Sequence, residues 1–215
     1  MPDLSQIKAV CFDVDSTVCL DDGIDMVAAY CNKGELVSQI TTQAMDGTID
    51  VTVALEQRLK ILGLSKDLIR QFLNDTPLRL TPGIERLVAS LRSSNVEVYL
   101  LFVPEDHVFS NRLIYNDDGV AVDFDRQQPT SRSDGKKEVV AAIKSKLSGE
   151  SKTGGVLVVG DGVTDAAACP PADAFLGFGG VIARPSVQRT TPFFFHSFDE
   201  MHTFLQHCGL ITHSS

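Results

Sequence analysis

The chain has 215 residues, enough for one large domain or for a domain that carries an inserted subdomain. Hydrophobic residues make up 43% of it and charged residues 22%, which is ordinary for a globular protein. The formal net charge of −9 at pH 7 argues against nucleic acid or an anionic membrane as the main partner. No apolar run reaches the roughly 18 residues that a membrane span needs.

The five cysteines bear on the cellular compartment. They are odd in number and contain no CxxC pair, which favours reduced thiols in a cytoplasmic protein over a disulfide framework. The N-terminal residues show no basic segment followed by an apolar one. We therefore expect no secretory signal and a cytoplasmic location.

The first half of the chain predicts one strand, a helical block and a second strand. Val10–Val14 is an apolar run typical of a buried strand. Residues 22–78 then show apolar residues at helical spacing without a strong strand signal. Thr81 and Pro82 predict the N-cap and the first residue of the next helix. The apolar run Val96–Leu101 predicts the strand after it.

The second half alternates short strands with helices. Residues 116–119, Asn-Asp-Asp-Gly, predict a hairpin turn between two strand-like runs. Helices are expected after Gly135 and after Ser197, with strands at Val156–Val159 and Phe175–Phe178. This order predicts an α/β fold with a doubly wound, mostly parallel, Rossmann-like sheet. We place the core at residues 1–18 and 80–215, and an inserted helical cap at 19–79.

One connection in this predicted sheet is too short. The apolar runs Val96–Val103 and Val108–Leu113 are separated by only four residues. Parallel neighbours need a crossover of about a dozen residues or more, usually a helix. The sequence therefore predicts that a crossover is missing near residues 102–108.

Acidic residues follow two of the predicted strands, in "AVCFDVDSTV" at 9–18 and "VLVVGDGVTDAAA" at 156–168. In open α/β sheets ligands bind at the carboxyl ends of the strands, where both clusters would lie. Asp13 and Asp15 are two residues apart, so in an extended chain their side chains point the same way. Neighbouring carboxylates are costly unless a cation joins them, and oxygen ligands without a His or Cys cluster favour Mg²⁺.

Such a site suits phosphoryl transfer. One carboxylate can attack phosphorus, the other can exchange protons with the leaving alkoxide and with water, and a lysine can balance the phosphate's charge. Each acidic motif by itself could be a structural turn with an Asp cap. Their occurrence together, each after an apolar strand, favours the metal-phosphate interpretation.

On these and other segments, the sequence resembles the haloacid dehalogenase superfamily and, within it, the phosphoserine phosphatase family. The likeness covers nearly the whole chain. The similar segments are "CFDVDSTV", "GID" at 23–25, "AMDGT" at 44–48, "LTPGI" followed by "ERLVASLR", "NRL" at 111–113 and "GDGVTDAAACPPADAFLGFGG".

The resemblance implies roles for residues of the predicted core. Asp13 matches the nucleophile, Asp15 the general acid and base, and Lys136 the phosphate-binding lysine. The matching Mg²⁺ ligands are Asp13, Asp161 and the backbone carbonyl of Asp15, with Asp165 helping to hold the metal shell.

Substrate recognition falls mainly to the cap by the same resemblance. Asp22 stands where the family has a Glu that meets the substrate ammonium, and Arg58 matches the arginine that binds the substrate carboxylate. On residues alone, Arg58 would be a solvated helix charge. Further matching substrate residues are Met45, for which a core methionine is the alternative, Gly47, Thr164 and Arg184.

The implied activity is Mg²⁺-dependent hydrolysis of O-phosphoserine through an aspartyl-phosphate, the last step of serine biosynthesis. In the family the second motif ends its strand in a phosphate-binding serine, followed by two glycines and a helix. Here Phe102 takes the serine's place, and the helix is missing. The alternative is therefore a catalytically impaired form or a regulatory binding protein. An alternatively spliced or mispredicted chain would also explain the gap.

Overall fold

The computed structural model describes residues 4–45, 48–101, 112–149 and 154–212. Within them, no helix is both long and apolar enough to cross a membrane. The strands are β1 (Ile7–Phe12), β2 (Glu97–Leu100), β3 (Leu113–Tyr115), β4 (Ala121–Phe124), β5 (Gly155–Gly160), β6 (Ala174–Phe178) and β7 (Phe194–Phe195). The α-helices are α1 (Gly23–Tyr30), α2 (Gly34–Met45), α3 (Val51–Leu62), α4 (Lys66–Asp75), α5 (Ile84–Ser93), α6 (Gly135–Gly149), α7 (Val163–Ala166), α8 (Pro185–Gln188) and α9 (Phe198–His207).

The core of the molecule is a parallel sheet with the strand order β2-β1-β5-β6-β7. Strand β1 is central, and Val10 lies opposite Val98 of β2 and Leu157 of β5. All four strand pairs of this sheet are parallel. The doubly wound, mostly parallel fold predicted from the sequence is confirmed.

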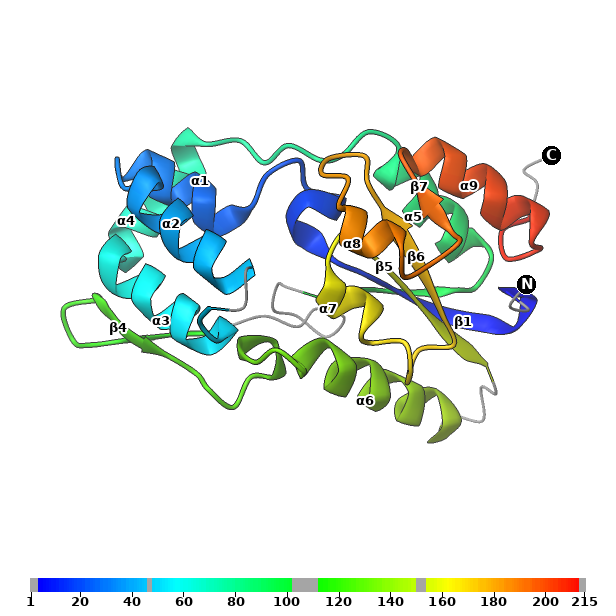
Figure 1. The fold of residues 1–215 in the computed structure, drawn as a ribbon. Helices are drawn as coiled ribbons and strands as arrows, with labels where there is room; N and C mark the ends of the chain where they lie inside the picture. The colour runs from blue at the N-terminus through cyan, green and yellow to red at the C-terminus, as the bar shows by residue number, and fades with distance from the viewer. Residues whose placement is uncertain (1–3, 46–47, 102–111, 150–153, 213–215) are drawn as a thin grey trace.

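Helices cover both faces of this sheet, as Figure 1 shows. Alternate residues of β1 point to opposite faces, so Val10 and Phe12 join a core cluster with α5 and α9. Ala9 and Cys11 join a second cluster with α6. Because both faces are buried, the strands read as nearly continuous apolar runs, and the predictions for β5 and β6 are within one residue of the structure. The prediction for β1 was displaced: the strand begins at Ile7 rather than Val10 and ends at Phe12 rather than Val14, because the chain turns after Asp13.

The segment after β1 forms a helical cap of α1–α4, on the left in Figure 1. Its small core contains Ala28, Val37, Leu62 and Leu64. The antiparallel hairpin of β3 and β4 turns at residues 116–119, as predicted. It packs on the cap, where Ala121 N–H donates to the Leu64 carbonyl at 2.8 Å. We therefore propose to count this hairpin with the cap, although it lies in the segment 80–215.

Two linkers join the cap to the core and pair with each other. Leu20 N–H donates to the Arg79 carbonyl at 3.0 Å, and Arg79 Nε donates to Asp21 Oδ2 at 2.9 Å. Thr81 N–H donates to the Val18 carbonyl at 2.9 Å, and the Thr81 hydroxyl to the Thr17 carbonyl at 2.7 Å. Helices α1–α4 are thus joined to the core by two paired chain segments next to the acidic end of β1.

The start of α5 differs from the prediction. The helix begins at Ile84 rather than at Pro82, because Gly83 precedes it with a φ of 87° that favours glycine. The Thr81 hydroxyl donates to the Thr17 carbonyl and therefore does not cap the helix. The predicted missing crossover at 102–108, with Phe102, lies outside the described residues. On the described side of that gap, β2 is the edge strand of the sheet.

Candidate active site

Three buried aspartates meet at the carboxyl ends of β1 and β5. Asp13 directly follows β1, Asp161 directly follows β5, and Asp165 lies on the short helix α7. Asp13 N–H donates to the Val159 carbonyl at 2.9 Å, which keeps the two strand ends together. One carboxylate oxygen from each aspartate lies within 4.8 Å of the other two. The sheet therefore brings Asp13 next to two aspartates that lie 148 and 152 positions later in the chain.

Lys136, near the start of α6, is the counter-charge for two of these aspartates. Its Nζ donates to Asp13 Oδ1 and to Asp165 Oδ1, each at 2.7 Å. Burial alone would lower the pKa of Lys136, but the two carboxylates outweigh it and raise the pKa. The lysine is therefore charged at neutral pH and fixed beside the predicted nucleophile.

The third aspartate has a different cation. Arg184, just before α8, donates from Nε to Asp161 Oδ2 at 2.9 Å. Burial and the charge of Asp13 raise the pKa of Asp161 to about 6, against the opposing effect of Arg184. Arg184, which the resemblance places in substrate binding, thus contacts the aspartate cluster. Its Nε is bonded to a carboxylate of that cluster.

These three carboxylates are chemically suited to hold Mg²⁺. Buried carboxylates at such short separation repel one another, and burial with Asp13 also raises the pKa of Asp165 to about 7. Their donor atoms are all oxygens, which a hard cation such as Mg²⁺ prefers. A divalent cation would relieve the repulsion that the protein's own two cations leave.

Asp15 is not one of these three residues, and its side chain is bonded to the cap. The chain turns after Asp13 through Val14–Val18, with Ser16 in the left-handed region at a φ of 57°. Asp15 Oδ1 accepts a hydrogen bond from the Gly23 N–H at 2.9 Å. Burial and the charge of Asp22 raise the pKa of Asp15 to about 7. A carboxyl group with this pKa can both donate and accept a proton near neutral pH, as a general acid and base must.

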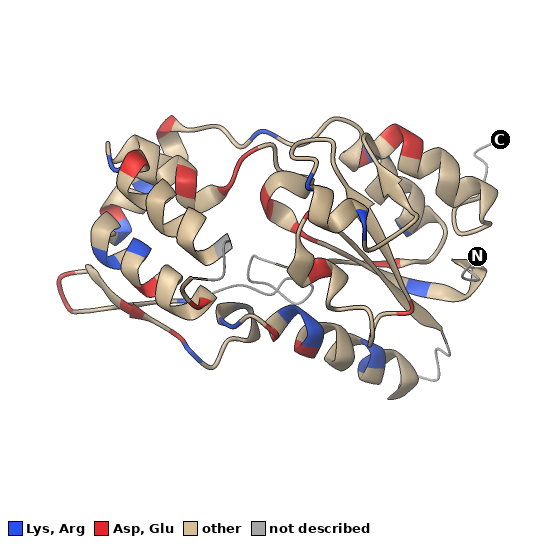
Figure 2. Cartoon of the chain, in the orientation of Figure 1, with Lys and Arg blue, Asp and Glu red and all other residues tan. Residues whose placement is uncertain are grey.

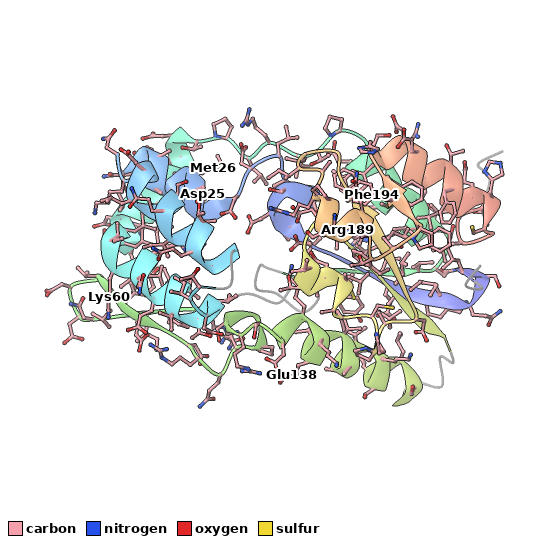
Figure 3. All side chains as sticks on the ribbon, viewed as in Figure 1. Asp25, Met26, Lys60, Glu138, Arg189 and Phe194 are labelled. Carbon is pink, nitrogen blue, oxygen red and sulfur yellow. The ribbon has the colours of Figure 1, made fainter. Side chains whose placement is uncertain are left out.

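A cavity of about 480 Å³ lies between cap and core next to Asp15. Its lining includes Asp22 and Arg58 from the cap, together with Val51 at the start of α3. Asp22 Oδ1 accepts from the N–H groups of Ile24 and Asp25, so this aspartate also caps α1. The linker that enters α1 is acidic in Figure 2, and Figure 3 shows Asp25 on this helix.

Arg58 is half-buried in the wall of this cavity. Its Nε donates to the Ala54 carbonyl at 3.3 Å, one turn earlier in α3. Burial lowers the pKa of Arg58, and the charges of Asp22 and Asp25 oppose that effect. The side chain is not the freely solvated helix charge of the alternative interpretation, since it faces the same cavity as Asp15.

The other predicted substrate residues divide into two groups. Thr164 lies on α7 next to Asp165, at the aspartate cluster rather than in the cavity lining. Gly47 and the side chain of Met45 lie outside the described residues. Sequence reasoning missed Gly160, where a Cβ would overlap the Asp165 carboxyl group, and Gly23, the donor to Asp15. In the sequence, each of these glycines stands directly beside an aspartate, Asp161 or Asp22, and this position could have indicated a close approach to an acidic side chain.

Comparisons with known proteins give a family and several relatives for this chain. A family model for haloacid dehalogenase-like hydrolases matches residues 7–173. The phosphoserine phosphatase of Bos taurus is 40% identical over 208 residues, which cover 90% of this chain and 91% of that protein. The chloroplastic phosphoserine phosphatase of Arabidopsis thaliana is 38% identical over 213 residues, covering 91% of this chain and 70% of that protein.

A solved structure shares the fold. It is a phospho-aspartyl intermediate analogue of a phosphoserine phosphatase, with a TM-score of 0.76 and 23% sequence identity. The superposition covers 93% of this chain and 99% of that one. At this identity, the likeness supports the arrangement of sheet and cap alone.

Proposed function

Because the chain belongs to the haloacid dehalogenase-like hydrolases and, within them, to the phosphoserine phosphatases, we propose that it hydrolyses O-phosphoserine to serine and phosphate with Mg²⁺. The observation that carries this proposal is the pairing of the Asp13, Asp161 and Asp165 cluster with Lys136 and Arg184. Asp15 lies beside it with a carboxyl pKa of about 7. The proposed nucleophile, cation site and proton donor thus lie near the carboxyl ends of β1 and β5.

In the proposed reaction, an oxygen of the Asp13 carboxylate forms a bond to phosphorus, and the bond from phosphorus to the serine oxygen breaks. Asp15 donates its proton to the departing alkoxide, which leaves as serine. Water then attacks the aspartyl-phosphate and gives its proton to Asp15, releasing phosphate and restoring the Asp13 carboxylate. Lys136 stabilises the negative charge of the phosphoryl oxygens in both steps.

Mg²⁺ would be held by the side chains of Asp13, Asp161 and Asp165 and the backbone carbonyl of Asp15, and it would neutralise charge on the phosphate. The oxygen-only donor set supports this ion. The bound ion would also stabilise these buried carboxylates in the ionised form, which the nucleophile needs in order to attack.

We propose that the cap recognises the amino acid part of the substrate. Arg58 would bind the substrate carboxylate, for which a planar guanidinium is well suited, and Asp22 would bind the ammonium group. Both residues line the cavity that contains Asp15, which supports these roles. Met45, Gly47 and Thr164 stay predicted substrate residues.

The test is Mg²⁺-dependent phosphate release by the purified, folded protein. We expect release from O-phosphoserine, and slower release from two analogues that lack the amino group or the carboxyl group. Loss of the carboxyl group should matter less in an Arg58→Ala variant than in the unchanged protein. If no small phosphomonoester is hydrolysed, the enzymatic proposal is wrong.

A second candidate is a catalytically impaired or regulatory form that binds phosphoserine without hydrolysing it. The sequence favours it at one position, because Phe102 replaces a serine that would donate to phosphate. Each lost donor of that kind removes about 2–4 kcal/mol of transition-state stabilisation. Calorimetric binding of O-phosphoserine without phosphate release would support this candidate over the first.

We further propose a cytoplasmic location and a role in serine biosynthesis, with a small-molecule substrate and no nucleic-acid partner. All five cysteines are free thiols, which supports a reducing compartment. Figure 2 shows acidic and basic residues interspersed along the elements of core and cap, and the net charge is −9. A chain with this net charge does not favour binding to a polyanion.

A further inference from the structure

Two cations divide the aspartate cluster between them. Lys136 pairs with Asp13 and Asp165, each at 2.7 Å, and Arg184 pairs with Asp161 at 2.9 Å. Each carboxylate of the proposed metal site therefore has one oxygen bonded to a fixed positive group. Lys136 belongs to the proposed chemistry with phosphate. Arg184 contacts the remaining ligand, Asp161, from a different element of the fold.

The backbone that carries Arg184 is held in place. The Arg184 carbonyl accepts hydrogen bonds from the N–H groups of Val187 and Gln188, each at 3.0 Å, and Pro185 begins α8. Val187 is fully buried in the core cluster under α6. Helix α8 also packs beside α7, which carries Asp165 (Figure 1). The guanidinium thus reaches Asp161 from a backbone segment that is anchored in the core by hydrogen bonds and by the buried Val187.

We propose that Arg184 is a positioning residue for the metal site: its Nε–H holds Oδ2 of Asp161 and so orients this carboxylate to offer Oδ1 to Mg²⁺. The inference rests on the proposed Mg²⁺ site. Carboxylates that bind metals are usually held by hydrogen bonds of this kind, and losing one costs metal affinity. A planar guanidinium on a fixed backbone restricts the rotation of a carboxylate more than a mobile ammonium does.

This role differs from substrate binding, which the family resemblance implies for Arg184. A positioning residue for the metal affects Mg²⁺ affinity when no substrate is present. A residue that binds only substrate affects the Michaelis constant and leaves Mg²⁺ binding alone. A residue that merely competes with the ion for Asp161 would, when removed, make Mg²⁺ bind more tightly.

The experiment is a calorimetric titration of the purified full chain with MgCl₂, without substrate. We expect Arg184→Gln to weaken Mg²⁺ binding about 10- to 100-fold. Arg184→Lys should restore part of the loss, because it keeps a charged donor. Arg189→Gln is the control, since Arg189 is an exposed residue just after α8 (Figure 3) and should leave the affinity unchanged.

The possible outcomes separate this inference from the proposed function. Unchanged or tighter Mg²⁺ binding by Arg184→Gln, with normal binding by the unchanged protein, overturns the positioning role alone. Failure of the folded, unchanged protein to bind Mg²⁺ overturns the proposed metal site and this inference with it. Thermal unfolding checks the fold of each variant, and Arg184→Lys decides the question if Arg184→Gln does not fold.

Discussion

The backbone N–H of Gly23 donates a hydrogen bond to Oδ1 of Asp15 at 2.9 Å. Gly23 is the first residue of α1 in the cap, and Asp15 belongs to the acidic turn after β1 in the core. The proposed general acid and base is therefore held by the helix N-terminus of the element that would recognise the substrate. This contact lowers the pKa of Asp15, which burial and Asp22 raise.

Gly23→Pro should remove this donor without breaking α1. Proline is favoured at the first position of a helix, and Asp22 before it has the extended conformation, with a ψ of 124°, that a following proline requires. We expect kcat/KM to fall about 10- to 100-fold, because a hydrogen bond to a charged group contributes about 1.5–3 kcal/mol. Steady-state kinetics on O-phosphoserine measure this.

Gly23→Ala serves as its control. Alanine keeps the N–H group, and its Cβ would lie 3.7 Å from Asp15 Oδ1, an ordinary contact. Equal losses of activity in the two variants would show that the side chain at this position matters and that the hydrogen bond does not.

Mg²⁺ should bind more tightly as the pH rises from about 5.5 to 7.5. The pKa of Asp161 is raised to about 6 and that of Asp165 to about 7, so both carboxyl groups hold protons in the lower part of this range. The ion must displace those protons, and binding therefore weakens as the pH falls. Calorimetry in buffers of different ionisation enthalpy should detect proton release at pH 6. An affinity that does not vary with pH would contradict the assignment of these ligands.

Lys136→Met should destabilise the metal-free protein, and more so at high pH. The variant leaves Asp13 and Asp165 buried without their cation, which costs about 3–5 kcal/mol of unfolding free energy when the carboxylates are ionised. The folded-state pKa of Asp165 is already raised, and losing the lysine raises it further. At pH 5.5 the carboxyl can stay protonated, so the cost should be smaller than at pH 8.

Denaturant unfolding at the two pH values measures this difference. Lys137→Met is the control, because Lys137 is exposed on the same turn of α6 and should change the unfolding free energy by about 0.5 kcal/mol or less. An equal loss of stability at pH 5.5 and pH 8 would argue that Lys136 acts through packing instead of charge.

Gly160→Ala should displace Asp165 and reduce both activity and stability. A Cβ at residue 160 would overlap the carboxyl group of Asp165. Because Asp165 is fully buried, its side chain cannot move aside into solvent. We expect a loss of about 1–3 kcal/mol of unfolding free energy, as in other overpacked cores. Gly149→Ala, at the exposed end of α6 with no atom of the described residues within 4 Å of the new Cβ, should be neutral or slightly stabilising. Thermal unfolding and kinetics of both variants test the contrast.

The buried strands and the aspartate cluster could be predicted because their signals are local. Buried parallel strands such as β5 are continuous apolar runs, and the acidic motifs begin where those runs end. The predicted beginning of α5 was wrong by two residues. The Thr81 hydroxyl bonds across the linker to the Thr17 carbonyl, and Gly83 takes the N-cap position of the helix. A hydrogen bond between residues so far apart in the chain cannot be predicted from the spacing of apolar residues.

The sequence by itself indicated the alternation of strands and helices along the chain, the acidic motifs at two strand ends and the helical block after the first strand. Apolar periodicity and residue type encode these properties directly. Only the tertiary structure decided that Arg184 pairs with Asp161, that Gly23 holds Asp15, and that the β3–β4 hairpin packs on the cap. Such contacts depend on which surfaces meet after the chain has folded, and that depends on the packing of the whole molecule.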